Sequence, residues 1–169
     1  EREHIKILFA VESGSRAWGW ESQDSDYDIR GVYVQDYNRV FGVREQINEE
    51  IRIFKGADKI LDKILDIELW DLKKFLKLMK NSNPSVWEWL SSEIVYIENP
   101  LRKNLMKIFM KKFSTYSLKR HYVSMAKQNY EKYLNDSSET ANLKKYVYII
   151  RSLACVLFIE KKKIPPPKN

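Results

Sequence analysis

A chain of 169 residues is long enough for one compact domain, or for a small domain with an added lobe. With 44% apolar and 13% aromatic residues but only five Gly and five Pro, the composition excludes a disordered, fibrous or low-complexity chain. The net charge of +7 divides into −5 over residues 1–100 (14 Lys+Arg, 19 Asp+Glu) and +12 over residues 101–169 (16 against 4). Solvated helical faces can carry such an excess, but its density favours an anionic partner such as nucleic acid or a polyphosphate.

The single cysteine, Cys155, lies in an apolar run, where we expect a small core residue rather than a nucleophile. One cysteine forms no disulfide within the chain, so a reducing, cytoplasmic location is expected. No stretch approaches the roughly 20 apolar residues that cross a bilayer, and no membrane partner is expected.

The first part of the chain has the pattern of strands joined by turns. Residues 5–11 predict a buried strand that stops at a turn over residues 12–15. A second strand is predicted over residues 27–34. A third is predicted over residues 64–69, although this short run could also be the first turn of a helix. The mixed segment 35–63 is assigned to a short helix with one or two edge strands.

From residue 70 the apolar period becomes helical, and residues 70–81 predict an amphipathic helix with interleaved lysines. Asn83 and Pro84 have the cap and first-turn preferences that open another helix. Further helices are predicted over residues 101–113, 115–134 and 140–161. We therefore expect an α+β fold, in which a small mixed sheet forms a core over residues 1–100, a basic helical lobe covers residues 101–164, and residues 165–169 form a tail.

The chemistry-bearing residues lie around the end of the first predicted strand. A turn at Gly14 and Ser15 can bring backbone N–H groups and a hydroxyl against phosphate oxygens. Asp26 and Asp28, spaced by two on a strand, point to the same side and can bind hard divalent cations such as Mg²⁺ or Mn²⁺. Asp66 on a neighbouring strand could complete a two-metal clamp for an in-line displacement. Each feature alone is also common in ordinary turns and caps, so the combination carries the prediction.

Residues 14–20 (GSRAWGW) and 24–30 (DSDYDIR) resemble the signature of the DNA polymerase β-like nucleotidyltransferase superfamily. The nearest branch is the bacterial and phage nucleotidyltransferases described as an RNA-repair-pathway polymerase β family. Residues 70–74, 83–92 and 144–151 also resemble segments of that branch, so the resemblance covers most of the chain. It implies a polymerase β-like palm core.

The resemblance also implies roles for five residues: Gly14 and Ser15 for the triphosphate, Asp26 and Asp28 for metal, and Asp66 as the third carboxylate. Family members often carry Gly where this chain has Leu69, which puts the register of the strand in question. Glu68 shares the strand face of Asp66 and is therefore the alternative third acid.

Four basic residues are candidate phosphate contacts. Arg16 follows the turn and could touch the triphosphate, or could be a surface or acid-paired arginine. Lys144, Lys145 and Arg151 could face the phosphates from the helical part, or could belong to a solvated helix face. Asp24, two residues before Asp26, is a turn or cap residue in one interpretation and a ligand in the other.

These observations predict an enzyme that moves a nucleoside monophosphate from an NTP, with ATP expected, to a hydroxyl and releases pyrophosphate. The basic helical part favours an RNA end as acceptor. A protein hydroxyl, as in antitoxin-type AMP transferases, is the second choice, and a small antibiotic is the third. The alternative from another class is a catalytically silent module that binds nucleotide or RNA. The oligomeric state is left open.

Overall fold

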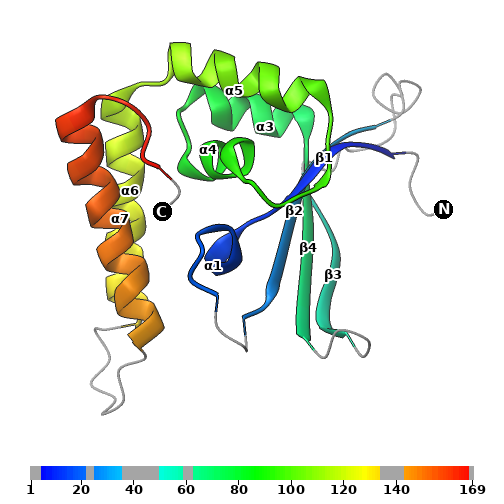
Figure 1. The fold of residues 1–169 in the computed structure, drawn as a ribbon, viewed down its shortest axis with the longest axis horizontal. Coiled ribbons are helices and arrows are strands. Elements are labelled where there is room, and N and C mark those ends of the chain that lie inside the picture. Colours follow the sequence, from blue (N-terminus) through cyan, green and yellow to red (C-terminus); the bar gives the residue numbers. More distant parts are fainter. Residues whose placement is uncertain (1–4, 22–24, 36–49, 59–62, 134–142, 168–169) are drawn as a thin grey trace.

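The computed structural model describes residues 5–21, 25–35, 50–58, 63–133 and 143–167 (Figure 1). Within these residues, five strands form one mixed sheet in the order β3-β4-β2-β1-β5, with β2 parallel to β4 and the other pairs antiparallel. They are β1 (Ile5–Glu12), β2 (Tyr27–Gln35), β3 (Glu50–Asp58), β4 (Lys63–Asp71) and β5 (Val95–Ile97). The predicted α+β fold with a small mixed sheet is therefore confirmed.

The helices follow the predicted pattern closely. They are α1 (Gly14–Ala17), α3 (Leu72–Lys80), α4 (Pro84–Ser91), α5 (Pro100–Lys112), α6 (Thr115–Tyr133) and α7 (Leu143–Lys162). The side chain of Asn83 accepts a 2.9 Å hydrogen bond from the N–H of Ser85, so the predicted cap opens α4. Asn99 caps α5 in the same way, accepting from the N–H of Leu101 at 2.9 Å. Asn caps with Pro at the first helical position explain why α4 begins as predicted and why α5 begins at Pro100, one residue before its predicted start.

The first predicted helix begins two residues later than expected. Trp70 is the partner of Val32 in the β2–β4 ladder, and its ring lies 3.9 Å from that of Trp89, measured between centroids. Asp71 ends the strand and caps α3 by accepting a 2.8 Å hydrogen bond from the N–H of Lys73. Sheet pairing and aromatic packing therefore keep Trp70 extended, although its spacing suits the apolar face of the helix.

Two strands test the weaker predictions. In the mixed segment 35–63, β3 is an edge strand as predicted, while the short helix predicted there has no counterpart in residues 50–58. Residues 36–49 and 59–62, where it could otherwise fall, lie outside the described residues. The sequence does not predict β5, because three residues give no readable period. This strand pairs with β1 and brings Tyr96 to the end of it.

Two apolar cores hold the described parts of the chain together. Helices α3, α4 and α5 cover the sheet, and the buried residues of this first core are Phe9, Val11, Val32, Phe75, Val86, Trp89, Leu90, Leu105 and Phe109. Helices α6 and α7 lie side by side (Figure 1) and enclose a second core of Leu118, Tyr122, Cys155 and Ile159. The predicted core position of Cys155 is thus confirmed. Helix α5 packs with the first core, whereas the division by charge places it in the basic lobe.

The run of prolines at residues 165–167 is also anchored. The indole N–H of Trp87 donates a 2.8 Å hydrogen bond to the carbonyl oxygen of Pro166. The proline tail therefore lies against α4. Across the parts of the chain that the structure describes, no helix is long and apolar enough to cross a membrane.

Candidate active site

The predicted phosphate turn lies directly against one of the predicted metal ligands. Gly14 has φ of +63°, and a Cβ added there would lie 2.3 Å from Oδ2 of Asp28. The N–H of Ser13 donates a 2.8 Å hydrogen bond to the carbonyl oxygen of Asp28. Only glycine combines this left-handed backbone with such a close approach. The turn and the carboxylate of Asp28 are therefore built as one unit.

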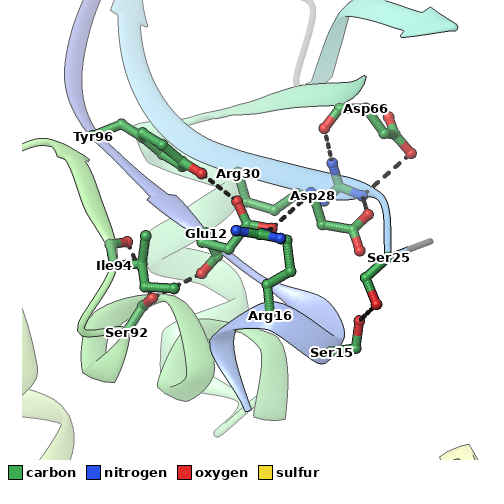
Figure 2. Close-up of polar contacts among 10 residues, drawn as sticks. All are labelled: Glu12, Ser15, Arg16, Ser25, Asp28, Arg30, Asp66, Ser92, Ile94 and Tyr96. Atoms are coloured by element: carbon green, nitrogen blue, oxygen red, sulfur yellow. Dashed lines mark hydrogen bonds and ion pairs between the residues drawn. The ribbon is translucent and has the colours of Figure 1, made fainter. Parts of the chain in front are cut away.

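The acidic residues of β2 and β4 meet across the parallel pair. Asp28 is the register partner of Asp66. Nη2 of Arg30 lies 3.0 Å from Oδ1 of Asp28 and 3.3 Å from Oδ2 of Asp66. Figure 2 marks both contacts with dashed lines. Asp28 and Arg30 thus share one strand face, as the spacing of two predicts. The guanidinium offsets the repulsion that two neighbouring carboxylates would otherwise feel.

The same register decides how the two candidate third acids lie. Asp66, rather than Glu68, stands beside Asp28. Glu68 is the register partner of Arg30, and its side chain accepts a 2.8 Å hydrogen bond from the indole N–H of Trp70. Asp26 is half-buried just before the start of β2. Asp24 lies outside the described residues.

A buried carboxylate, Glu12, holds the backbone of Asp28 by a hydrogen bond, although the sequence pattern does not single this residue out. Its side chain is fully buried and accepts a 2.9 Å hydrogen bond from the N–H of Asp28 and a 2.5 Å hydrogen bond from the hydroxyl of Tyr96. Burial raises the pKa of Glu12, and the two hydrogen bonds oppose that rise. The pKa of Tyr96 is raised by burial and by its bond to Glu12. A signal is present in the sequence, since Glu12 continues the buried run of β1 two residues before Gly14.

The two side chains that follow Gly14 have protein partners. The hydroxyls of Ser15 and Ser25 lie 3.3 Å apart, and both residues are buried. The guanidinium of Arg16 lies 4.1 Å from the ring centre of Tyr27, and its Nε lies 3.9 Å from Oε1 of Glu12. Arg16 is therefore acid-paired at the site, and its contact with a triphosphate stays a prediction.

Arg151 connects helix α7 to the site instead of facing open solvent. Its Nη1 donates a 2.9 Å hydrogen bond to Oε1 of Glu88, and its guanidinium lies 3.8 Å from the ring centre of Trp18. Trp18 directly follows α1 and also meets the ring of Tyr148, with 5.6 Å between centroids. Arg151 is 7% exposed, so a role in phosphate binding requires it to leave these partners. Lys144 lies in the first turn of α7, and its contact with phosphate also stays a prediction.

The donor set suits a hard divalent cation bound together with phosphates. In the ranges that the structure describes, no three His, Cys, Asp or Glu side chains gather into a metal centre. Mg²⁺ commonly takes one or two protein carboxylates and obtains its other oxygen ligands from substrate phosphates and water. Asp28 and Asp66 provide two carboxylates. Because Gly14 has no Cβ, the turn can lie against the carboxylate of Asp28, within reach of an ion bound there.

This combination of fold, glycine turn and paired acids belongs to the polymerase β-like class of nucleotidyltransferases. The chain matches over residues 1–169 the family described as "RNA repair pathway DNA polymerase beta family", and it belongs to that family. The resemblance inferred from the sequence motifs is thereby confirmed.

Two known proteins extend the comparison. The chain is 42% identical over 170 residues to the "Uncharacterized protein YcgL" of Bacillus subtilis (strain 168), covering 98% of this chain and 60% of that protein. It thus spans less than two thirds of this curated relative. Among solved structures, the nucleotidyltransferase-like protein from Exiguobacterium sibiricum 255-15 is 14% identical, with a TM-score of 0.38, and the match covers 94% of this chain and 51% of that one.

Proposed function

We propose that the protein is a metal-dependent nucleotidyltransferase that moves a nucleoside monophosphate from an NTP, with ATP expected, to a hydroxyl acceptor. The observation that carries this proposal is the contact of the Gly14 turn with Asp28, which lies in register beside Asp66. A phosphate-binding turn and a cation-binding pair are the two parts that transfer from a triphosphate needs, because the chemistry depends on positioning and on charge stabilisation.

The residues of the candidate site have distinct roles in the proposed reaction. The backbone N–H groups of the turn and the hydroxyl of Ser15 bind the triphosphate oxygens. Asp28 and Asp66 would hold Mg²⁺ or Mn²⁺, which when bound neutralises charge on the phosphates, and Asp26, just before β2, stays a predicted third ligand. The acceptor oxygen attacks the α-phosphorus, the bond to the β-phosphate oxygen breaks, and pyrophosphate leaves. Asp66 orients the acceptor hydroxyl and takes its proton.

An RNA end is the acceptor that charge and family favour. Residues 101–169 carry a net charge of +12, and the family description refers to an RNA repair pathway. Four lysines of α5 are exposed and add to this basic surface: Lys103, Lys107, Lys111 and Lys112. Lysine is well suited to backbone phosphates, which supply most of the affinity for single-stranded RNA.

Transfer is tested by incubating the protein with labelled NTPs, Mg²⁺ and a panel of RNA and protein acceptors. Label should appear on RNA ends, and pyrophosphate should be released. Asp28→Asn should abolish transfer and the rise in melting temperature that Mg²⁺ with ATP produces by mass action. The matched control is Glu131→Gln, which removes one exposed carboxylate from α6 and should keep both. An unaltered protein that shows neither transfer nor a ligand-dependent rise would contradict the proposal.

The RNA acceptor has a separate test. Exchange of Lys144 and Lys145 for Gln should flatten the salt dependence of RNA binding, by roughly 0.7 in the log–log slope for each phosphate that the variant no longer neutralises. Arg151 is left in place because it is buried with Glu88. If the unaltered protein binds no RNA at low salt but labels a protein hydroxyl, the acceptor is a protein.

A further inference from the structure

The guanidinium of Arg30 is fastened to both strands of the site. Its Nη1 donates to the backbone carbonyl oxygens of Ile29 at 3.1 Å and of Asp66 at 2.8 Å. Its Nη2 donates to Oδ1 of Asp28 at 3.0 Å and to Oδ2 of Asp66 at 3.3 Å. The side chain is only 16% exposed. One edge of the guanidinium is therefore fixed by the backbone, and the other faces both acids (Figure 2).

This arrangement places a permanent positive charge where the two acids converge. The guanidinium of arginine is positively charged in proteins. The carboxylate oxygens that accept from Nη2 are of the kind that bind divalent cations. A free cation must therefore approach a pair whose charge is already half neutralised, and it must do so against a like charge. A triphosphate, being anionic, is attracted by the same guanidinium.

We propose that Arg30 is a resident counter-ion of the Asp28–Asp66 pair, which disfavours binding of a free divalent cation and favours binding of the nucleotide phosphates. The site then takes metal and NTP together rather than loading the metal first. This inference rests on the proposed function and adds to it the residue that sets which ligands the site accepts.

A purely structural role for Arg30 makes a different prediction. If the side chain only ties β2 to β4, its removal disorders the site and weakens the binding of every ligand. A counter-ion instead has effects of opposite sign, because its charge opposes the cation and attracts the anion. The sign of the two changes therefore separates the interpretations.

The test measures two affinities on the Arg30→Gln variant. Binding of Mn²⁺ without nucleotide is followed by the electron paramagnetic resonance of the free ion, and binding of ATP in excess chelator is followed by calorimetry. We expect Mn²⁺ to bind about tenfold more tightly and ATP about tenfold more weakly than in the unaltered protein. The matched control is Arg120→Gln, which removes the same charge from an exposed position on α6 and should change each affinity less than twofold.

Weaker or unchanged Mn²⁺ binding by folded Arg30→Gln would overturn the inference. Where circular dichroism shows that this variant does not fold, Arg30→Lys decides. It keeps the charge, so Mn²⁺ should not bind more tightly than to the unaltered protein. A fall in both affinities would assign Arg30 to holding the strands, and tighter Mn²⁺ binding would show that charge is not the cause. If the unaltered protein fails to bind ATP even with Mn²⁺, the proposed function fails instead.

Discussion

Replacing Gly14 with Ala should damage the fold and the site together. The φ of +63° costs a residue with a Cβ about 1–2 kcal/mol. The added Cβ would also lie 2.3 Å from Oδ2 of Asp28, and relieving such overpacking costs about 1–3 kcal/mol. The sum of about 2–5 kcal/mol is a large part of the roughly 5–15 kcal/mol that stabilises a typical domain. The carboxylate of Asp28 must also move, which loosens its contact with Arg30.

Urea denaturation followed by circular dichroism measures the free energy of unfolding of this variant and of a matched control. Gly19→Ala is the control, because Gly19 has a similar φ of +71° and carries the same backbone cost. The free energy of unfolding should fall further in Gly14→Ala than in Gly19→Ala, by about 1–3 kcal/mol. The rise in melting temperature with Mg²⁺ and ATP should be lost only in Gly14→Ala.

Equal destabilisation of the two variants, with the ligand-dependent rise intact in both, would contradict this account of Gly14. It would mean that the turn does not press on Asp28, and that the site tolerates a methyl group there.

Three further predictions test the contacts around the site. The hydrogen bond from Arg102 lowers the pKa of Glu98 below 4.5. The stability that this contact adds to the folded protein is therefore present above pH 4.5 and is lost as the pH falls through the lowered pKa. The unfolding free energy of Glu98→Gln should thus be about 0.2–1 kcal/mol lower than that of the unaltered protein at pH 7, and the difference should disappear in acid. Exchange of Glu88 alone for Leu should lower the free energy of unfolding by about 3–5 kcal/mol, because it leaves Arg151 buried without its acid. In a double-mutant cycle measured by denaturation, exchange of both Glu88 and Arg151 for Leu should lower it by less than the sum of the two single exchanges. Burial raises the pKa of the Cys155 thiol, so an aromatic disulfide reagent at pH 7.5 should react with it slowly until denaturant is added, and rapid reaction in the native protein would contradict its core position.

Local patterns in the chain are enough to predict most elements. The apolar runs of β1 and β2 and the Asn–Pro openings of α4 and α5 carry period and cap signals that neighbouring residues alone determine. The β-structure at residues 64–69 is also predicted, and it extends to Asp71 because Trp70 pairs with β2. β5 escapes prediction because three residues become a strand only when β1 lies beside them.

For the candidate site, local sequence is enough to specify the turn at Gly14 and the shared face of Asp28 and Arg30. A left-handed turn requires glycine, and side chains two apart on a strand point the same way. Three other features come from the folded arrangement: Asp66 stands beside Asp28, Arg30 bridges the two acids, and Glu12 is buried behind them. The first two depend on the register between β2 and β4, and a shift of one residue would turn Asp66 to the opposite face of the sheet.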